Sequence, residues 1–330
     1  MPAKKMQAKK NHHYVWAEYL KRWSKDGRDV CYVSESGKIA KDSVRGLAKE
    51  RHFYQSRSLS PLQLEIIRLF SSKADANIQR GHTSILSKYL QIQRREELLS
   101  LLGNTDADAR GALEVLNANF IENLHAIYEN KAKPILHSLA SKDISPLQDD
   151  DQLLRLSMFL GQQTTRTSVF KQQCLAVADS RVREDMEGCW WFLSYMFGVN
   201  IGSMIYKARS SLTFCLLVNE TRTNFITSDH PIVNVHEGLD EDRISPPEKA
   251  DLFYPISPKV ALMANDSDRF ASGLNNVDES FVLRMNDRIS KASEKTIFGM
   301  TPEDIRPYRL NVGARLTMIT RHSSSGSSER

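Results

Sequence analysis

The stretch Asn224–Asn234, NFITSDHPIVN, lies where a long helical pattern gives way to short β-rich runs. Two apolar runs within it are typical of strands, and the polar residues 227–230 (TSDH) separate them. Pro231 fixes the backbone before the second run, so the polar side chains fall at a sheet edge or turn, where they can converge on a ligand. A structural role is the alternative, because Ser and Asp form turns with nearby backbone and His-Pro can be a tight β connection.

The segments around this stretch are also β-rich. Short runs of β-branched and apolar residues are separated by Asn, Asp, Gly and Pro, which is typical of an antiparallel meander. The predicted strands are 212–219, 224–227, 232–235, 252–256, 260–264 and 296–300. Residues 278–295 return to helical spacing through Phe281, Met285, Ile289 and Ala292. The region from about 211 to 300 is therefore predicted to be mainly sheet, with one helix.

The central part of the chain, about 61–209, is predicted to be helical. Apolar stripes at helical spacing extend over 62–72, 84–102, 107–140, 152–182 and 183–208. Near the N-terminus, 14–23 is predicted to form a short helix, and 29–34 a small hairpin with 38–40. These patterns predict an α+β fold, in which the central helical segment packs on a mixed, mainly antiparallel sheet formed by the N-terminal hairpin and the C-terminal strands.

The predicted organisation is a single α+β domain over 13–321, with a basic flexible tail over 1–12 and a disordered tail over 322–330. Four lysines in the first ten residues supply most of the net charge of +5. The basic tail can attract nucleic acid without specificity, or it can be a solvated terminus. The nearly neutral remainder does not predict a protein that coats duplexes, which would carry a basic stripe through its body.

The cysteines and the apolar segments exclude several classes of protein. The four cysteines are widely spaced without a Cys-x-x-Cys pair, which argues against a zinc knuckle and a disulfide scaffold. Free thiols fit a reducing cytosol, so a cytoplasmic location is expected. The N-terminal lysines precede no apolar segment, and the most apolar window, 189–199 (CWWFLSYMFGV), is too short for a membrane span. Trp190, Trp191 and Phe192 within it are expected to be helix core rather than a base-stacking platform.

A polar interruption, 161–167 (GQQTTRT), lies inside the helical region. Arg166 offers a planar fork of donors that suits phosphate or carboxylate, and Gln163 could hold the site or its ligand. The alternative is a buried arginine that bridges helix and sheet. Glu129 lies just ahead of Pro134, and in isolation it would be a solvated carboxylate.

Histidines near the N-terminus are further candidates. His12 and His13 are adjacent and point in different directions, so at most one of them is expected to face a common site. The pair is not a zinc motif, because the His-x-x-x-His spacing is missing. The sequence also has no Gly-rich phosphate loop, no Rossmann fingerprint and no Gly-x-Ser-x-Gly elbow.

Several segments together resemble a known family. They are HHYVWAEYLKRW (12–23), HFY (52–54), FLGQQTTRT (159–167), NFITSDHPIV (224–233) and LRMND (283–287). The chain resembles the bacterial and phage-associated family known as domain of unknown function 4238. That family typically has a His-Tyr-Val/Ile-Pro-x-x-Tyr-Leu-x-x-Phe element, Gln-x-x-x-Arg-Thr, Thr-Ser-Asp-x-Pro and a late Asn. The residues on these positions are His13, Tyr14, Tyr19, Leu20, Arg166, Thr167, Thr227, Ser228, Asp229, Pro231 and Asn286. Trp16 replaces the usual Pro, and Trp23 the usual Phe.

The resemblance implies that distant polar residues belong to one unit, but it implies no reaction. The residue types suit phosphodiester hydrolysis, in which His13 or His230 would transfer protons and Arg166 would stabilise the phosphate charge. Asp229 would orient a histidine or, together with Glu129, hold a divalent metal such as Mg²⁺ or Mn²⁺. Substrate-binding roles are predicted for Arg166, Gln163, Ser228 and Asn286.

The leading hypothesis is a nuclease-like phosphodiester hydrolase, acting as an effector in conflict between bacteria and phages or other mobile elements. Its expected partner is nucleic acid. One alternative is a non-catalytic module that recognises nucleic acid or another anionic ligand, or in which the polar cluster braces helices against the sheet. A second alternative is a hydrolase or transferase that acts on nucleotides.

Overall fold

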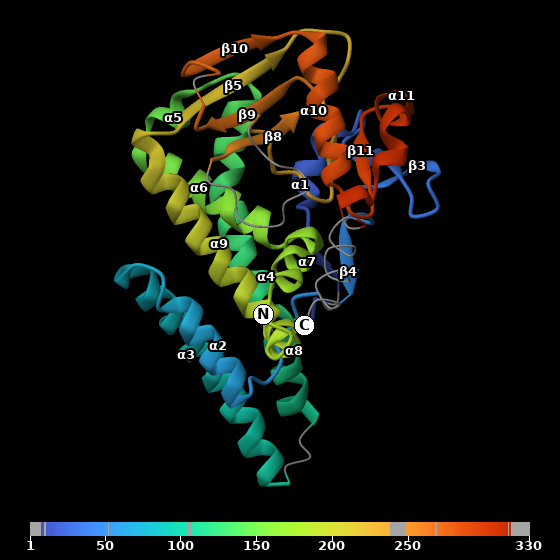
Figure 1. Ribbon diagram of the computed structural model, residues 1–330. Coiled ribbons are helices and arrows are strands. Elements are labelled where there is room, and N and C mark those ends of the chain that lie inside the picture. Colours follow the sequence, from blue (N-terminus) through green and yellow to red (C-terminus); the bar gives the residue numbers. More distant parts are fainter. Residues whose placement is uncertain are drawn as a thin grey trace, which may run out of the picture.

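The computed structural model describes residues 8–9, 11–51, 53–103, 107–237, 249–267, 269–315 and 317. It confirms the α+β class: helices occupy the middle of the chain, and the strands come from its two ends (Figure 1). The predicted C-terminal tail, 322–330, and His52 of the HFY segment lie outside the described residues. Within the described ranges, no helix combines the length and the apolar composition that a membrane crossing needs.

The N-terminal segment contains the predicted hairpin. Its elements are β1 (Asn11–His13), α1 (Ala17–Leu20), η1 (Lys21–Trp23), β2 (Asp29–Val33), β3 (Ile39–Ser43) and β4 (Lys49–Arg51). β2 and β3 pair in antiparallel fashion, as expected. β1 begins at Asn11, inside the predicted flexible tail, because it pairs with β4 and buries His12 completely. This pairing joins segments nearly forty residues apart, so local sequence patterns do not reveal it.

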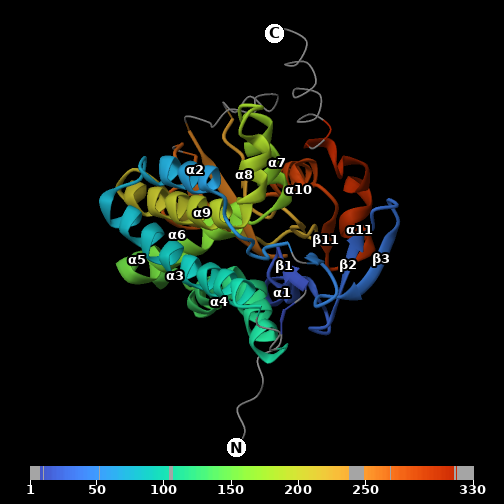
Figure 2. The same cartoon turned by 90° about the horizontal axis from the view of Figure 1, so that it is seen from below.

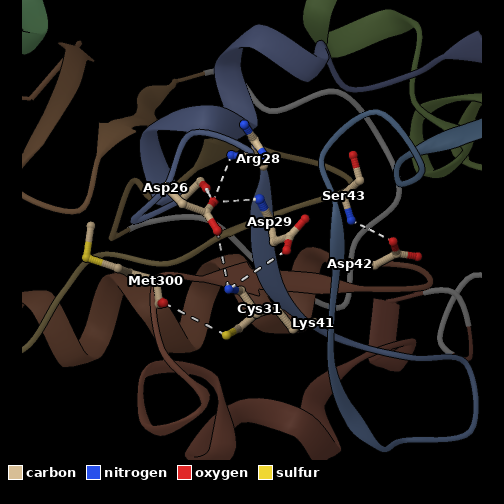
Figure 3. Close-up of polar contacts among 9 residues, drawn as sticks. Asp26, Arg28, Asp29, Cys31, Lys41, Asp42, Ser43 and Met300 are labelled. Atoms are coloured by element: carbon tan, nitrogen blue, oxygen red, sulfur yellow. Dashed lines mark hydrogen bonds and ion pairs between the residues drawn. The ribbon is translucent and has the colours of Figure 1, made fainter.

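The turn that leads into β2 is organised by Asp26 (Figure 3). Its Oδ1 accepts the backbone N–H groups of Arg28 and Asp29 at 2.8 and 2.9 Å. These bonds hold the pKa of Asp26 below its ordinary range. Within β2, Cys31 Sγ donates to the backbone oxygen of Met300 at 3.8 Å, and this bond links β2 to the C-terminal part of the chain.

The helical region consists of α2 (Pro61–Ser71), α3 (Ala76–Leu101), α4 (Ala107–Ala140), α5 (Ser145–Gln148), α6 (Asp150–Thr165), α7 (Ser168–Ala176), α8 (Arg183–Gly188), α9 (Trp190–Lys207) and η2 (Ala208–Ser210). The helix predicted over 152–182 is interrupted after Thr165, because Arg166 ends α6 and the Thr167 side chain caps α7. α6 and α9 approach closely, and a Cβ at Gly161 would collide with the backbone of Gly198 and Gly202.

The remaining elements are β5 (Thr213–Asn219), β6 (Thr227–Ser228), β7 (Val233–Asn234), β8 (Asp251–Ser257), β9 (Val260–Asn265), β10 (Gly273–Val277), α10 (Glu279–Ala292), β11 (Ile297–Gly299), α11 (Pro302–Ile305) and η3 (Arg306–Asn311). The described strands form a five-stranded sheet, β10-β5-β9-β8-β7, a four-stranded sheet, β3-β2-β11-β6, and the two-stranded sheet β1-β4. The hairpin thus joins C-terminal strands, as predicted, but in a separate sheet. β10 was not predicted, and it pairs in parallel with β5.

The five-stranded sheet lies between two apolar layers. Phe214 and Leu216 of β5 pack with α4 and α6, whereas Cys215 and Leu217 pack with α10. This alternation follows from the two-residue repeat of a strand. Trp190, Trp191 and Phe192 belong to a third apolar cluster among the helices, so the predicted core role is confirmed. Figure 2 shows α4, α6 and α9 grouped on one side of the molecule, and the hairpin with β11 and α11 on the other.

Candidate functional site

Arg166 lies at the junction of the helical layer and the N-terminal segment. Its Nη1 donates to Glu129 Oε1 at 2.6 Å, and its Nε donates to the backbone oxygen of Tyr14 at 3.1 Å. Its Nη2 donates to Gln163 Oε1 at 2.8 Å, while Gln163 Nε2 donates to the same Tyr14 oxygen at 3.0 Å. Three of the predicted site residues therefore meet here, and only 2% of the Arg166 side chain is exposed.

The charge of Arg166 is compensated within the fold. Burial by itself would lower the pKa of Arg166, but the charge of Glu129 raises it above its ordinary value. The Tyr54 hydroxyl also donates to the backbone oxygen of Arg166. An arginine with a carboxylate and fixed oxygen acceptors around it stays charged in a buried position. This arrangement joins α6, α4 and the segment that follows β1.

His13 stands at the edge of this junction, at the end of β1. Its Nε2 atom is buried and makes no hydrogen bond within the described part of the chain. Burial lowers the pKa of His13, the backbone of Arg45 partly opposes this, and the charge of Arg166 lowers it further. The imidazole is therefore neutral near pH 7.

Two ionisable side chains on α4, Glu122 and His125, were not predicted as site residues. Glu122 lies two turns before Glu129 on the same helix face, and burial raises its pKa although Arg166 opposes the effect. His125, between them, is buried, its ring packs edge-on against Tyr54 at 4.9 Å, and neither of its ring nitrogens has a partner among the described residues. The spacing of positions 122, 125 and 129 is the signal that could have identified them.

Thr167, the residue after Arg166, contacts the stretch Asn224–Asn234. Thr167 Oγ1 and His230 Nδ1 are 2.8 Å apart. Burial lowers the pKa of His230 to about 4, so this ring is neutral at physiological pH. Ser228 Oγ donates to the backbone oxygen of His230 at 2.9 Å and accepts its N–H at 3.1 Å. Ser228 thus shapes the turn, and its hydroxyl is used within the protein.

Asp229 fastens this turn to the loop between α10 and β11. Its Oδ1 accepts from the backbone N–H of Glu294 at 3.0 Å, and its Oδ2 accepts from those of Lys295 and Thr296 at 2.5 and 3.1 Å. Burial raises the pKa of Asp229 to about 6, although these three bonds favour the charged form. Both carboxylate oxygens are directed at backbone groups.

Asn286, on α10, also hydrogen-bonds to backbone groups of the stretch Asn224–Asn234. Its Oδ1 accepts the N–H of Ile226 at 3.0 Å, and its Nδ2 donates to the oxygen of Asn224 at 2.8 Å. The side chain therefore satisfies the backbone on both sides of Phe225, just ahead of the short strand β6. The strand predicted over 224–227 is largely replaced by these side-chain bonds, and β6 is only Thr227–Ser228.

The predicted residues thus form two neighbouring groups. Glu129, Gln163 and Arg166 are in direct contact, with His13 beside them, and Thr167 connects this group to the turn that contains Asp229 and His230. Asp229 and Glu129 have different partners, and nowhere in the described ranges do three His, Cys, Asp or Glu side chains gather as metal ligands would. Arg166, Asp229 and His230 are each less than a tenth exposed.

A separate, open hollow of about 500 Å³ lies beside α10. None of the predicted site residues lines it. Its lining is Val235, Glu237, Arg269, Leu283, Arg284, Met285, Asp287, Arg288 and Lys291. Four cationic side chains thus face two carboxylates. Arg284, Arg288 and Lys291 recur at i, i+4 and i+7, which places them on one helix face. This spacing is visible in the sequence, but Arg269 and Glu237 join the group only in the folded protein.

Aromatic rings lie beside two of the four cations, Arg269 and Arg284. The Arg269 guanidinium lies 5.6 Å from the ring centre of Phe270 and 5.3 Å from that of Phe281. The Arg284 guanidinium lies 5.8 Å from the same Phe281 ring. The carboxylates pair with two of the four cations: Glu237 with Arg269 at 3.4 Å and Asp287 with Lys291 at 2.8 Å.

The family relationship agrees with the order of the motifs along the chain. No curated protein and no solved structure matches this sequence. The model of the family described as "Protein of unknown function (DUF4238)" matches residues 11–303, which includes β1, the Arg166 junction, the 224–234 stretch and α10. The chain therefore belongs to the DUF4238 family.

Proposed function

We propose that this protein recognises an anionic, phosphate-bearing ligand in the hollow beside α10. The observation that carries the proposal is the lining itself: four cationic side chains, one of them held over two aromatic rings, face two carboxylates in an open hollow. Arginine suits phosphate because its donors form a planar fork. In this proposal, the buried junction at Arg166 fixes the helices and the sheet on which the hollow depends.

The ion pairs in the hollow do not prevent ligand binding. The Glu237 side chain is 83% exposed and that of Asp287 is 41% exposed. Exposed pairs of this kind contribute only about 0–1 kcal/mol, because water and salt screen them. A phosphate with two negative charges can therefore take over the donors of Lys291 at little cost.

Isothermal titration of the purified protein with inorganic pyrophosphate tests the proposal. We expect binding that weakens as salt is raised, and a loss of about tenfold or more in affinity for Arg284→Glu, because a charge-assisted hydrogen bond is replaced by repulsion. Arg155→Glu is the matched control, since Arg155 is also an exposed arginine on a helix surface. Equal binding by Arg284→Glu and the unmodified protein would overturn the proposal.

Phosphodiester hydrolysis is a second candidate, and His13 is the observation that favours it. A neutral imidazole with an unpartnered Nε2, next to the charge of Arg166, suits a general base beside a phosphate-stabilising group. The substrate would have to open the Arg166–Glu129 pair, because Arg166 is buried. An effector role against phages or mobile elements belongs to this candidate alone.

Degradation assays on RNA, DNA and nucleotides test the second candidate. The expected result is cleavage that His13→Ala abolishes while the thermal melting curve stays unchanged. His137→Ala provides a control histidine on α4, away from the described contacts of Arg166. If the protein cleaves none of these substrates, or if His13→Ala cleaves them normally, hydrolysis at this junction is excluded.

A further inference from the structure

We infer that the hollow beside α10 takes a nucleoside phosphate, either free or at the end of a nucleic-acid strand, in preference to a bare inorganic anion. This inference rests on the proposed function and names the class of ligand. It follows from three properties of the lining: an apolar part, guanidinium groups held in place by rings, and a row of positive charge.

The apolar part of the hollow has no use in binding a bare anion. Leu283 is 46% exposed and lies in the lining, next to the buried residues Val235 and Met285. An exposed leucine beside cations remains in contact with water until an apolar group covers it. A nucleobase is apolar on its faces and polar only at its edges, so it can cover Leu283 while its edges remain solvated.

The guanidinium groups of Arg269 and Arg284 are held in place by the same aromatic ring. Both lie within 6 Å of the centre of Phe281, and Arg269 also contacts the ring of Phe270. Because these contacts already restrict the arginine side chains, less conformational entropy is lost when a ligand binds. A held guanidinium offers a planar face on which a base can stack and a fork of donors for phosphate oxygens.

The positive charge is extended along the helix. From Arg284 to Lys291 the rise along α10 is about 10 Å, since each residue of an α-helix advances about 1.5 Å. This length separates the end of the hollow near Leu283 from the end near Lys291. A nucleoside monophosphate fits this polarity, with its base near Leu283 and Arg269 and its phosphate near Arg288 and Lys291. The volume of about 500 Å³ is ample for such a ligand.

Titration with a graded set of ligands tests the inference. The set is inorganic phosphate, ribose 5-phosphate, adenosine monophosphate, uridine monophosphate and an eight-nucleotide single strand of thymidylate with a 5′-phosphate. The nucleoside monophosphates are expected to bind about tenfold more tightly than ribose 5-phosphate, because stacking and apolar contact of a base add to phosphate binding. Competition between the single strand and a monophosphate then shows which of the two binds more tightly, and so whether the hollow prefers a strand end or a free nucleotide.

Substitutions separate the two parts of the ligand. Leu283→Ser is expected to remove the advantage of the nucleotides over ribose 5-phosphate, whereas Lys291→Ala weakens the binding of every phosphate compound. Leu274→Ser is the matched control, because Leu274 is a similarly exposed leucine, 52% exposed, on β10. If ribose 5-phosphate binds as tightly as the nucleotides, the inference is wrong while anion recognition stands. If no phosphate compound binds, the proposed function fails as well.

Discussion

The guanidinium of Arg166 and the carboxylate of Glu129 meet at 2.6 Å, across the boundary between α6 and α4. The next residue, Thr167, contacts His230 in the turn after β6. Two successive residues at the end of one helix thus connect the helical layer to both ends of the chain, because the Tyr14 oxygen also accepts from Arg166. Polar groups are costly to bury singly, so each contact depends on the others.

Removal of Glu129 is expected to destabilise the fold strongly. Glu129→Ala leaves the buried charge of Arg166 without its carboxylate, and breaking a buried pair from one side costs about 3–5 kcal/mol. The free energy of unfolding, from urea titration, measures the effect. The double variant Glu129→Ala/Arg166→Met should recover much of the loss, because no buried charge remains. A single variant as stable as the parent would show that the pair has no structural role.

Gly161→Ala is expected to destabilise the protein by about 1–3 kcal/mol, as overpacking generally does. The added Cβ would meet the backbone of Gly198 and Gly202, where α6 and α9 are in contact. Gly111→Ala on α4 is the control, because a Cβ there meets nothing within 4 Å. That substitution should stabilise the helix by about 0.5–1 kcal/mol. Urea unfolding of both variants is the measurement, and a harmless Gly161→Ala would contradict the close approach of the helices.

Asp229 should make the stability of the protein depend on pH. Its pKa is about 6 in the folded state, above the value of about 3.9 for an unfolded aspartate, so the folded state binds more protons between these values. Its contribution to the free energy of unfolding therefore falls as pH rises from about 4 to 6. Subtracting the pH profile of Asp229→Asn from that of the parent isolates this contribution. Glu65→Gln, at an exposed carboxylate, is the control. A difference that rises with pH in this window would contradict the prediction.

His230 should contribute to the pH profile with the opposite sign. Its pKa is about 4 in the folded state, below the value of about 6.5 for an unfolded histidine, so the unfolded state binds more protons in this window. The contribution of His230 to stability is complete above about pH 6.5 and is lost as pH falls to about 4. Because Asp229 opposes it, NMR titration of the His230 ring is the decisive measurement. A ring that protonates near pH 6.5 would show that it is not buried.

The contact between Thr167 and His230 can be tested by itself. Thr167→Val removes the hydroxyl that faces the buried ring and caps α7, at an expected cost of about 1–3 kcal/mol. Thr164→Val is the control, because the Thr164 hydroxyl bonds only to the backbone oxygen of Leu160 in its own helix, among the contacts described. Chemical denaturation of the two variants should separate them clearly. Similar stabilities would mean that the Thr167 hydroxyl does not secure the turn.

The sequence by itself determined the features that depend on local periodicity. The helix predicted over 107–140 is α4 with the same bounds, and the hairpin of β2 and β3 was visible in its alternation and turn residues. The family motifs also included Arg166, and the structure places Glu129 and Gln163 in contact with it. The helix and the hairpin were predictable because each depends on residues that lie close together in the sequence.

Only the tertiary structure decided what the polar residues contact. The sequence offered Asp229 equally as a site residue and as a turn residue, and the backbone of residues 294–296 is what occupies its oxygens. β10 escaped prediction because its sequence, GLNNV, is rich in Gly and Asn, which are depleted in strands, and it pairs in parallel with β5, more than fifty residues earlier in the chain. The hollow beside α10 likewise needs Arg269 and Glu237 to meet a helix far along the chain. Burial and pairing are properties of these long-range contacts, and periodicity in the sequence cannot encode which partner each side chain finds.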